Sequence, residues 1–135
     1  MAEMTTQDIV KNSDEVRDHN LDWERTYASL VLAVRSNEYR VFRTNNTLFL
    51  IHIDSPGVAQ VYTFNADSKH RFLGNMKEFL KAMKVAKYHT VYGITDSEQM
   101  LRVMERAGFN GKIEQMGMEN GKPMFKGTMN VSSRR

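Results

Sequence analysis

The chain has 135 residues, of which 41% are hydrophobic and 26% charged, a composition typical of one globular domain rather than a disordered chain. It contains no cysteine, which excludes disulfides, thiolate metal ligands and cysteine nucleophiles. The longest apolar stretches, Ser29–Val34 and Leu48–Ile53, are too short to span a bilayer, and the N-terminus lacks the apolar core of a signal peptide. We therefore expect a soluble, cytoplasmic protein.

The net charge of +3 is unevenly distributed along the chain. Residues 1–24 contain seven acidic and two basic residues, whereas the rest contains 9 acidic and 17 basic ones. An acidic segment can fold back onto a basic body or contact a basic partner. The composition alone favours a simpler interpretation, in which residues 1–20 form a solvated acidic helical segment.

Residues 5–20 are predicted to form one or two short polar helical turns, with Thr5 or Ser13 as an N-cap. A longer helix is predicted at about Asp22–Ser36, with Trp23 anchoring its start to the core. Apolar residues recur there at the spacing of one helix face: Tyr27, Leu30, Val31 and Val34.

The next segments alternate with a period of two and are rich in β-branched and aromatic residues, which predicts strands. They are Tyr39–Arg43, Leu48–Ile53 and Val58–Phe64. A tight hairpin at Thr44–Thr47 and a turn at Ser55–Gly57 would join them into an antiparallel meander.

A second long helix is predicted after Asp67 or Ser68, either of which can cap it. Its apolar residues recur at helical spacing: Phe72, Leu73, Met76, Phe79, Leu80 and Met83. His89–Ile94 is a predicted strand, and a helix to about Ala107 follows it.

Thr95 and Glu98 have the spacing of a capping box at the start of that third helix, and Met100, Leu101 and Met104 are expected to face inward. Two final strands, Lys112–Met118 and Met124–Val131, flank an Asn-Gly hairpin turn.

The predicted order is helix, three strands, helix, strand, helix and two strands. The unit from Val58 to Ile94 is strand–helix–strand, and such a crossover places its two strands parallel or nearly adjacent in one sheet. The sequence therefore predicts an α/β fold with a mixed, mostly antiparallel sheet flanked by helices on both faces. The predicted domain layout is an acidic segment at 1–20, one domain at 21–131 and a disordered tail at 132–135.

Residues 58–131 resemble the second half of the Gcn5-related N-acetyltransferase (GNAT) fold, in which a meander leads into a long helix, a strand, a helix ending in Gly-Phe and a closing hairpin. The local matches are Phe79–Met83, Thr90–Ile94 and Arg106–Phe109. The N-terminal third matches only as helices followed by strands. Among members of this fold, the chain is most similar to small bacteriophage-encoded proteins, including an internal virion protein of short-tailed coliphages.

In active members of the family, a loop of pattern Gln/Arg-x-x-Gly-x-Gly/Ala binds the coenzyme A pyrophosphate at the start of the long helix. The resemblance places Arg71, Gly74 and Asn75 over this motif as cofactor-binding residues. Met76 departs from it, because a long side chain stands where Gly or Ala lets the phosphate approach. The stretch also keeps the helical apolar spacing, which favours Arg71 as a surface charge and Gly74 as an adaptation to packing.

Many members protonate the departing thiolate with a Tyr at the position that Met104 occupies here, and the Asn often found at the start of that helix is Ser97. Strand 58–64 contains no Glu, Asp or His to act as a general base. The nearest polar groups are Tyr62, Asn65 and Asp67. We therefore predict no catalytic residue.

Other features favour structural roles. The four histidines lack metal spacing, so no metal site is predicted, and His52 is expected to be half-buried and hydrogen-bonded. A row of lysines, Lys77, Lys81 and Lys84, has no interleaved aromatic residue and is typical of the solvated face of a helix rather than a nucleic-acid site. The final hairpin is rich in methionine, which suits either core packing or an adaptable partner interface: Met116, Met118, Met124 and Met129.

The sequence thus predicts a non-catalytic GNAT-like bacteriophage protein that acts as a structural or protein-binding module without a cofactor, in the host cytoplasm or the virion. Its partner would be another virion protein or a second copy, and neither a membrane nor a nucleic acid. Two alternatives stay open: an active acetyl-CoA-dependent N-acetyltransferase with an atypical pyrophosphate loop, and an inhibitor of a host protein.

Overall fold

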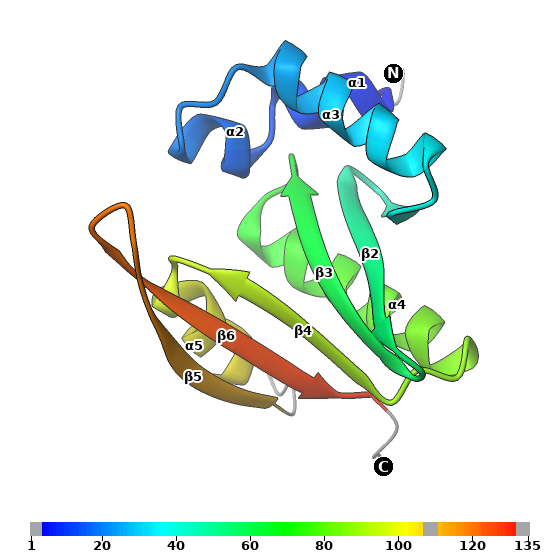
Figure 1. Ribbon diagram of the computed structural model, residues 1–135, viewed down its shortest axis with the longest axis vertical. Coiled ribbons are helices and arrows are strands. Elements are labelled where there is room, and N and C mark those ends of the chain that lie inside the picture. Colours follow the sequence, from blue (N-terminus) through cyan, green and yellow to red (C-terminus); the bar gives the residue numbers. More distant parts are fainter. Residues whose placement is uncertain (1–3, 107–110, 132–135) are drawn as a thin grey trace. The chain divides into compact units, whose positions relative to one another are not determined.

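The computed structural model describes residues 4–106 and 111–131, and it divides the chain into two compact units. The first unit comprises Met1–His52 and Tyr62–Phe79, and the second comprises Ile53–Val61 and Leu80–Arg135. The six strands that the structure describes form one sheet in the order β1-β2-β3-β4-β6-β5 (Figure 1).

Three helices begin the first unit: α1 (Thr6–Lys11), α2 (Asp14–Asp18) and α3 (Trp23–Arg35). Both predicted N-caps are confirmed, because Thr5 forms a capping box with Asp8 and the Ser13 side chain accepts a hydrogen bond from the Val16 N–H. The α3 helix begins one residue after its predicted start, and the Asp22 carboxylate caps it. These starts were predictable because a cap depends on residues within one turn.

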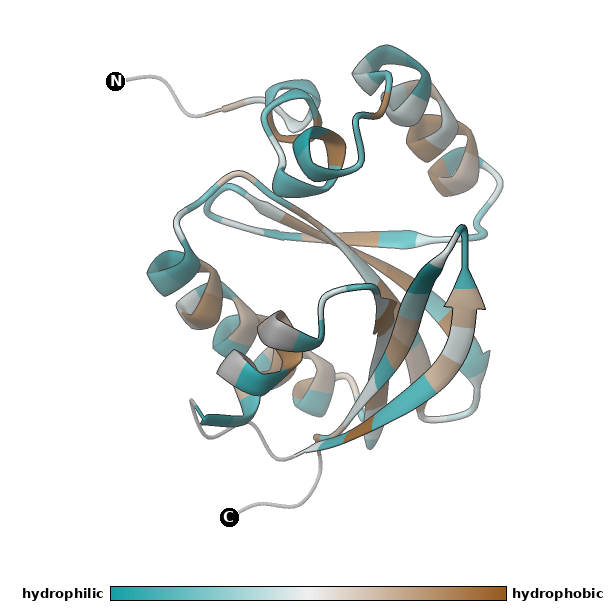
Figure 2. Ribbon diagram, turned by 90° about the vertical axis from the view of Figure 1, so that its left-hand side faces the viewer, coloured by the Kyte–Doolittle hydropathy of each residue, from teal (hydrophilic) through white to brown (hydrophobic). Residues whose placement is uncertain are grey.

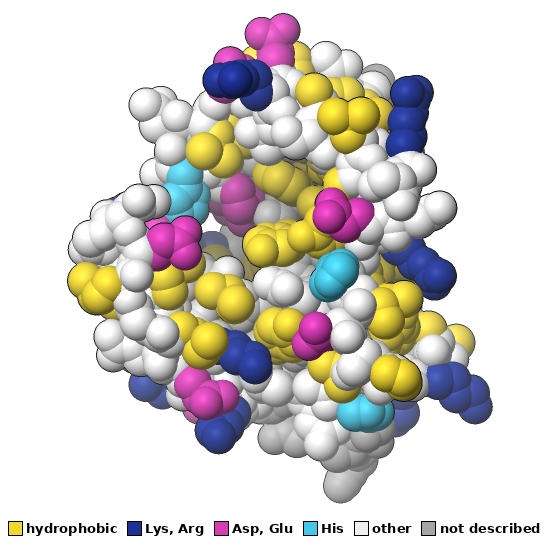
Figure 3. All heavy atoms as spheres, in the orientation of Figure 1, with side chains coloured by type: hydrophobic (Ala, Val, Ile, Leu, Met, Phe, Trp, Pro, Cys, Tyr) yellow, Lys and Arg dark blue, Asp and Glu magenta, His cyan; other side chains and the backbone are white. Residues whose placement is uncertain are grey.

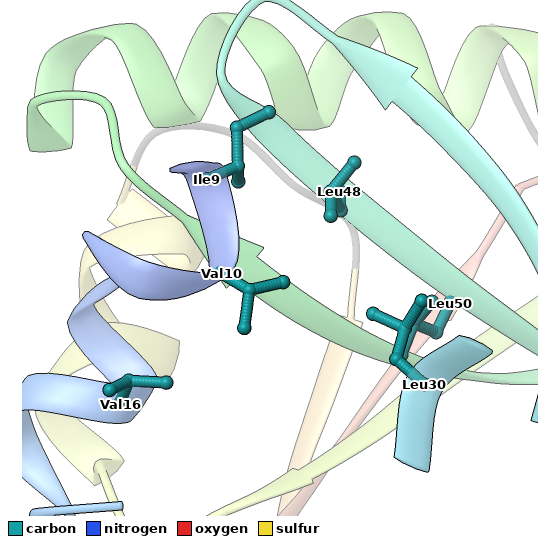
Figure 4. Close-up of a cluster of buried hydrophobic side chains, with 6 residues drawn as sticks. All are labelled: Ile9, Val10, Val16, Leu30, Leu48 and Leu50. Carbon is teal, nitrogen blue, oxygen red and sulfur yellow. The ribbon is translucent and has the colours of Figure 1, made fainter. Parts of the chain in front are cut away.

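The prediction of a solvated N-terminal segment is wrong on one face. Ile9 and Val10 are fully buried and Val16 is 7% exposed. They belong to one hydrophobic cluster with three residues from later elements, Leu30, Leu48 and Leu50 (Figure 4). The few apolar residues of the segment lie together on its buried side, and a count of its charges does not reveal that arrangement.

The first unit also contains β1 (Arg40–Thr44), which pairs antiparallel with β2 (Thr47–Ser55) around the predicted hairpin. Asn45 in that hairpin has a φ of 50°, a conformation that Asn tolerates better than most residues. His52 of β2 is half-buried, as predicted, and its Nδ1 lies 3.1 Å from the carbonyl oxygen of Glu38.

The long helix α4 (Lys69–Val85) follows β3 (Val58–Asn65), and both elements contribute residues to both units. Within the first unit, the rings of Phe49 and Phe79 stack with their centroids 4.3 Å apart. Phe42 of β1 lies against both rings, with centroid distances of 6.2 and 5.9 Å. This aromatic cluster fixes the first half of α4, because close-packed rings tolerate little displacement.

In the second unit, β4 (Thr90–Thr95) runs parallel to β3, as the crossover predicted. The helix α5 (Glu98–Arg106) follows, and then the hairpin of β5 (Gly111–Glu119) and β6 (Lys122–Asn130). The predicted Asn-Gly turn is confirmed, with φ values of 52° at Asn120 and 78° at Gly121.

The predicted capping box at Thr95 is wrong. The Met100 N–H donates to the Ser97 hydroxyl, so Ser97 is the cap, and Thr95 instead accepts from the N–H of Ser97 itself. Both residues have side chains suited to capping, and the chain uses the one next to the first helical residue.

The predicted fold class is confirmed as a mixed, mostly antiparallel six-stranded sheet with helices. None of the helices that the structure describes is long and apolar enough to cross a membrane. The predicted Gly108-Phe109 helix end and the predicted tail at 132–135 lie outside the described residues.

Candidate functional site

The three residues that the sequence placed over the pyrophosphate motif lie within α4 rather than in a loop. Arg71 is exposed in the first turn, and its N–H donates to the Ser68 hydroxyl, 3.2 Å away. A Cβ added at Gly74 would have no atom within 4 Å, so Gly74 is not an adaptation to packing. Asn75 is only 1% exposed. Arg71 and Gly74 are therefore accessible to a ligand, whereas Asn75 is not.

The segment that joins β3 to α4 is Ala66–Ser68, which contains no glycine. Ser68 caps the helix, as predicted, because its hydroxyl accepts from Arg71 and its carbonyl accepts from the Phe72 N–H at 2.8 Å. Phe72 and Met76 are each 4% exposed. The helical interpretation of this stretch is therefore correct.

Asn75 is the centre of a buried hydrogen-bond network. Its Nδ2 donates to the Thr47 hydroxyl and to the Asp67 carboxylate, both at 2.8 Å. Its Oδ1 accepts from the Asn45 Nδ2 at 2.7 Å. Both N–H donors and the carbonyl oxygen of the Asn75 amide thus form hydrogen bonds within the first unit.

Asn65, at the end of β3, is the second centre of the network and is 3% exposed. Its Oδ1 accepts from the Thr47 hydroxyl at 2.8 Å and from the Asp67 N–H at 3.1 Å. The Asp67 carboxylate also accepts from the backbone N–H of Asn46 at 3.0 Å. The Asp67 carboxylate thus links the hairpin before β2 to the turn before α4.

Two carboxylates from α2 complete the network. Asn65 donates its backbone N–H to Glu15 Oε1 at 2.8 Å and its Nδ2 to Asp14 Oδ2 at 3.0 Å. The Thr63 hydroxyl lies 3.4 Å from Glu15 Oε2. The acidic N-terminal segment therefore does fold back, onto the end of β3.

The pKa of Glu15 is raised from its ordinary 4.5 to about 7, chiefly by burial and to a smaller extent by the neighbouring charge of Asp14. The hydrogen bonds from Asn65 and Thr63 act in the opposite direction, because they favour the charged carboxylate. Desolvation is the largest of these effects. A pKa near neutrality makes Glu15 the most unusual acid that the structure describes.

The electrostatic character of this turn is negative. Asp14 and Glu15 accept hydrogen bonds from Asn65 at the start of the turn, and Asp67 within the turn accepts one from the Asn46 N–H. With a pKa of about 7, Glu15 carries only part of a negative charge at neutral pH. A helix start normally attracts anions through its free N–H groups. Here carboxylates lie beside that start, and they would repel a pyrophosphate. In the described part of the chain, no group of three or more acidic or histidine side chains is placed to hold a metal ion.

The position expected to hold a proton donor is apolar. Met104 of α5 is 6% exposed and, with Leu101, lines a small pocket against β5 and β6. A thioether has no proton to donate. The hydroxyl of Ser97, at the start of the same helix, accepts the capping hydrogen bond from the Met100 N–H.

Similarity to solved structures identifies the fold. A putative acetyltransferase from Salmonella typhimurium, solved with acetyl-CoA, superposes with a TM-score of 0.62 at 11% identity, covering 98% of this chain and 94% of that one. The ribosomal-protein-S18-alanine N-acetyltransferase of Escherichia coli gives 0.59 at 12% identity, covering 99% and 94%. A probable acetyltransferase of the GNAT family from Chromobacterium violaceum gives 0.60 at 13%, covering 82% and 68%.

The chain therefore has the GNAT fold, and identities this low establish the fold alone. A scan against protein-family models finds no match, and a search of curated protein sequences finds no significant relative.

The sequence predicted Asp67 as a possible helix cap and Asn65 and Asp67 as polar groups near a strand that lacks a base, but it did not connect them to Glu15. The sequence contained one signal, since amide and acidic residues flank two predicted strands: Asn45 and Asn46 precede one, and Asn65 and Asp67 follow the other. Side chains at strand ends can meet residues from distant segments. Nothing in the spacing of Asp14 or Glu15 indicates their partners, because these lie about fifty residues away.

Proposed function

We propose that this chain is a GNAT-fold protein without acetyltransferase activity, which acts as a structural or protein-binding module. The observation that carries the proposal is the carboxylate network at the β3–α4 turn, where the resemblance to active family members implies pyrophosphate binding. A negative, hydrogen-bonded turn is a poor site for a ligand whose phosphates carry several negative charges.

Two further features support the proposal. Met76 and Met104 are buried where active members are expected to have a small residue and a proton donor. Acetyl transfer from a thioester can proceed by positioning alone, so the loss of the donor is weaker support than the character of the turn.

Calorimetric titration with acetyl-CoA tests the proposal. We expect no heat of binding up to millimolar ligand, and the putative acetyltransferase from Salmonella typhimurium that was solved with acetyl-CoA serves as the positive control. Micromolar binding would contradict the proposal. If that binding were lost in Arg71→Glu and kept in Lys77→Glu, which makes the same charge change further along α4, the predicted cofactor role of Arg71 would hold instead.

The more specific part of the proposal, a bacteriophage origin with a place in the virion, rests on the sequence resemblance. Under it the chain would contact other virion proteins or a second copy of itself. Mass spectrometry of purified particles should then detect the chain in constant proportion to the capsid protein, and its absence from particles would remove the virion role.

An active N-acetyltransferase is the second candidate, and one observation favours it. Glu15 of α2 has a pKa of about 7 and accepts a hydrogen bond from the end of β3, which suits a general base working near neutral pH. If this candidate is right, acetyl transfer to an amine should rise with pH through about 7, and Glu15→Gln should abolish that rise. A flat, background rate in both proteins would exclude it.

A further inference from the structure

The strand β5 is an end strand of the sheet and is almost entirely exposed. Of its nine residues, only Ile113 is half-buried, and Met116 and Met118 are 53% and 65% exposed. Figure 3 shows hydrophobic side chains at the surface over this hairpin, and Figure 2 shows polar and apolar residues interspersed along it. Long exposed edge strands readily pair with another strand unless they are protected.

A bulge sets which side chains of β5 share a face. The register with β6 shifts between Gln115 and Gly117, and Gly117 has a φ of 128°, which favours glycine. A bulge inserts one extra residue, so the alternation of side chains is displaced by one position beyond it. Odd-numbered residues after the bulge therefore lie on the face that even-numbered residues occupy before it.

The β6 partners show the result. Lys112 is opposite Thr128 and Glu119 is opposite Lys122, and these two β6 positions are six apart, so they share one face. Ile113 is opposite Gly127 and Met118 is opposite Pro123, which are four apart and share the other face. Lys112 and Glu119 thus lie on one face of the hairpin, and Ile113 and Met118 lie on the other.

We infer that β5 pairs antiparallel with β5 of a second copy of this chain, about a two-fold axis between Gln115 and Met116. That pairing places Lys112 opposite Glu119 of the other copy and Ile113 opposite Met118, each twice. Residues directly opposite each other in antiparallel strands must share a face, and the bulge alone makes these pairs do so. The strand is complementary to itself in charge and in apolar contact.

This inference rests on the proposed function, because it names a partner for the binding module. It also assigns a use to the exposed methionines: strand pairing would place Met118 against Ile113, and Met116 near the symmetry axis. Met side chains adapt to irregular apolar surfaces, which suits a contact between two twisted hairpins.

Sedimentation equilibrium of the full chain tests the inference by charge reversal and rescue. The wild-type mass should rise from 15.6 kDa toward twice that value as the concentration is raised. Lys112→Glu and Glu119→Lys should each weaken the dimer about tenfold, because like charges then face each other at two symmetry-related positions. The double variant should restore the wild-type affinity, since it exchanges the two charges.

Lys77→Glu, on α4, is the matched control and should leave the dimer unchanged. Circular dichroism of each variant separates loss of folding from loss of pairing. A wild-type chain that stays monomeric at every concentration would overturn the inference, because β5 would then not pair with a second copy. A dimer that is insensitive to all the charge reversals would overturn it too. Neither result bears on acetyl-CoA binding, which calorimetry tests separately.

Discussion

Two turns in this protein lead from a strand into a helix, and they are stabilised in different ways. The β4–α5 turn is capped locally, since Thr95 and Ser97 accept hydrogen bonds from N–H groups two and three positions later, and Asp96 within it adds an ion pair to Lys122 at 3.8 Å. The β3–α4 turn combines its local Ser68 cap with side chains from the N-terminal helices and the first hairpin. The same local structure can therefore be stabilised mainly by its own cap or by side chains from distant segments.

The largest expected effect is at the centre of the β3–α4 network. Asn75→Ala should lower the free energy of unfolding by about 3 kcal/mol, because it removes the donor to the buried Thr47 hydroxyl, one of the donors to the Asp67 carboxylate and the acceptor for the Asn45 amide. Urea denaturation followed by circular dichroism measures this change. A loss below about 1 kcal/mol would mean that water satisfies these groups and that the network is not cooperative.

The second effect is a pH dependence of the free energy of unfolding, which arises from Glu15 at the β3–α4 turn. Glu15 releases its proton near 4.5 in the unfolded chain and near 7 in the folded one, so the folded state binds more protons between these values. Stability should therefore fall as pH rises through that window, by at most about 1.4 kcal/mol per pH unit, and then level off above pH 7.

Glu15→Gln should remove this fall, since a neutral amide keeps the acceptor for the Asn65 N–H without the cost of a buried charge. Unfolding free energies of both proteins from pH 4 to 8 provide the comparison, with Glu24→Gln at an exposed site on α3 as the control. Curves for Glu15→Gln and wild type that run parallel would show that Glu15 ionises normally.

At the β4–α5 turn, the expected loss is smaller. Ser97→Ala should cost about 1 kcal/mol, the usual value for an N-cap, because only the Met100 N–H loses its partner. Ser97→Asn should retain most of the stability, since Asn caps equally well. If both variants were equally destabilised, the hydroxyl would have a role beyond capping.

The smallest expected effect is a gain. Gly74→Ala should stabilise the protein by about 0.5–1 kcal/mol, because Gly74 lies in α4 with open space at its Cβ position. Gly57→Ala is the contrasting control and should destabilise, since a Cβ there would lie 2.5 Å from His89 Cδ2 at a φ of 77°. Thermal unfolding distinguishes the two, and destabilisation by Gly74→Ala would indicate an unrecognised contact.

The same contrast explains what the sequence could predict. Helix starts at Thr5, Ser13 and Ser68 and the hairpin at Asn120 follow from neighbouring residues, and the structure confirms them. Thr95 was predicted as a cap in place of Ser97 because two suitable residues stand close together. Even this error is local and displaces the cap by only two residues.

The network around Asn65 and Asn75 could not be predicted in this way. Its bonds join Thr47 to Asn65 across 18 positions and Asn65 to Asp14 across 51. No periodicity or spacing rule reaches that far, so the sequence named Asn65, Asp67 and Asn75 separately, and the family resemblance implied a cofactor-binding role for Asn75. The cofactor-binding role of Arg71, Gly74 and Asn75 stays a prediction for calorimetry to test.

The long reach of the Asn65 contacts has a consequence for the order of folding. The hydrogen bond between the Asn65 N–H and Glu15 spans 50 positions, so α2 cannot dock until β3 exists and a loop of that length has closed. The hairpin around Asn45 and the helix caps need no such closure. During synthesis, the N-terminal helices therefore emerge first but acquire their anchor late, and Ile9 and Val10 lack their cluster partners Leu48 and Leu50 until β2 follows.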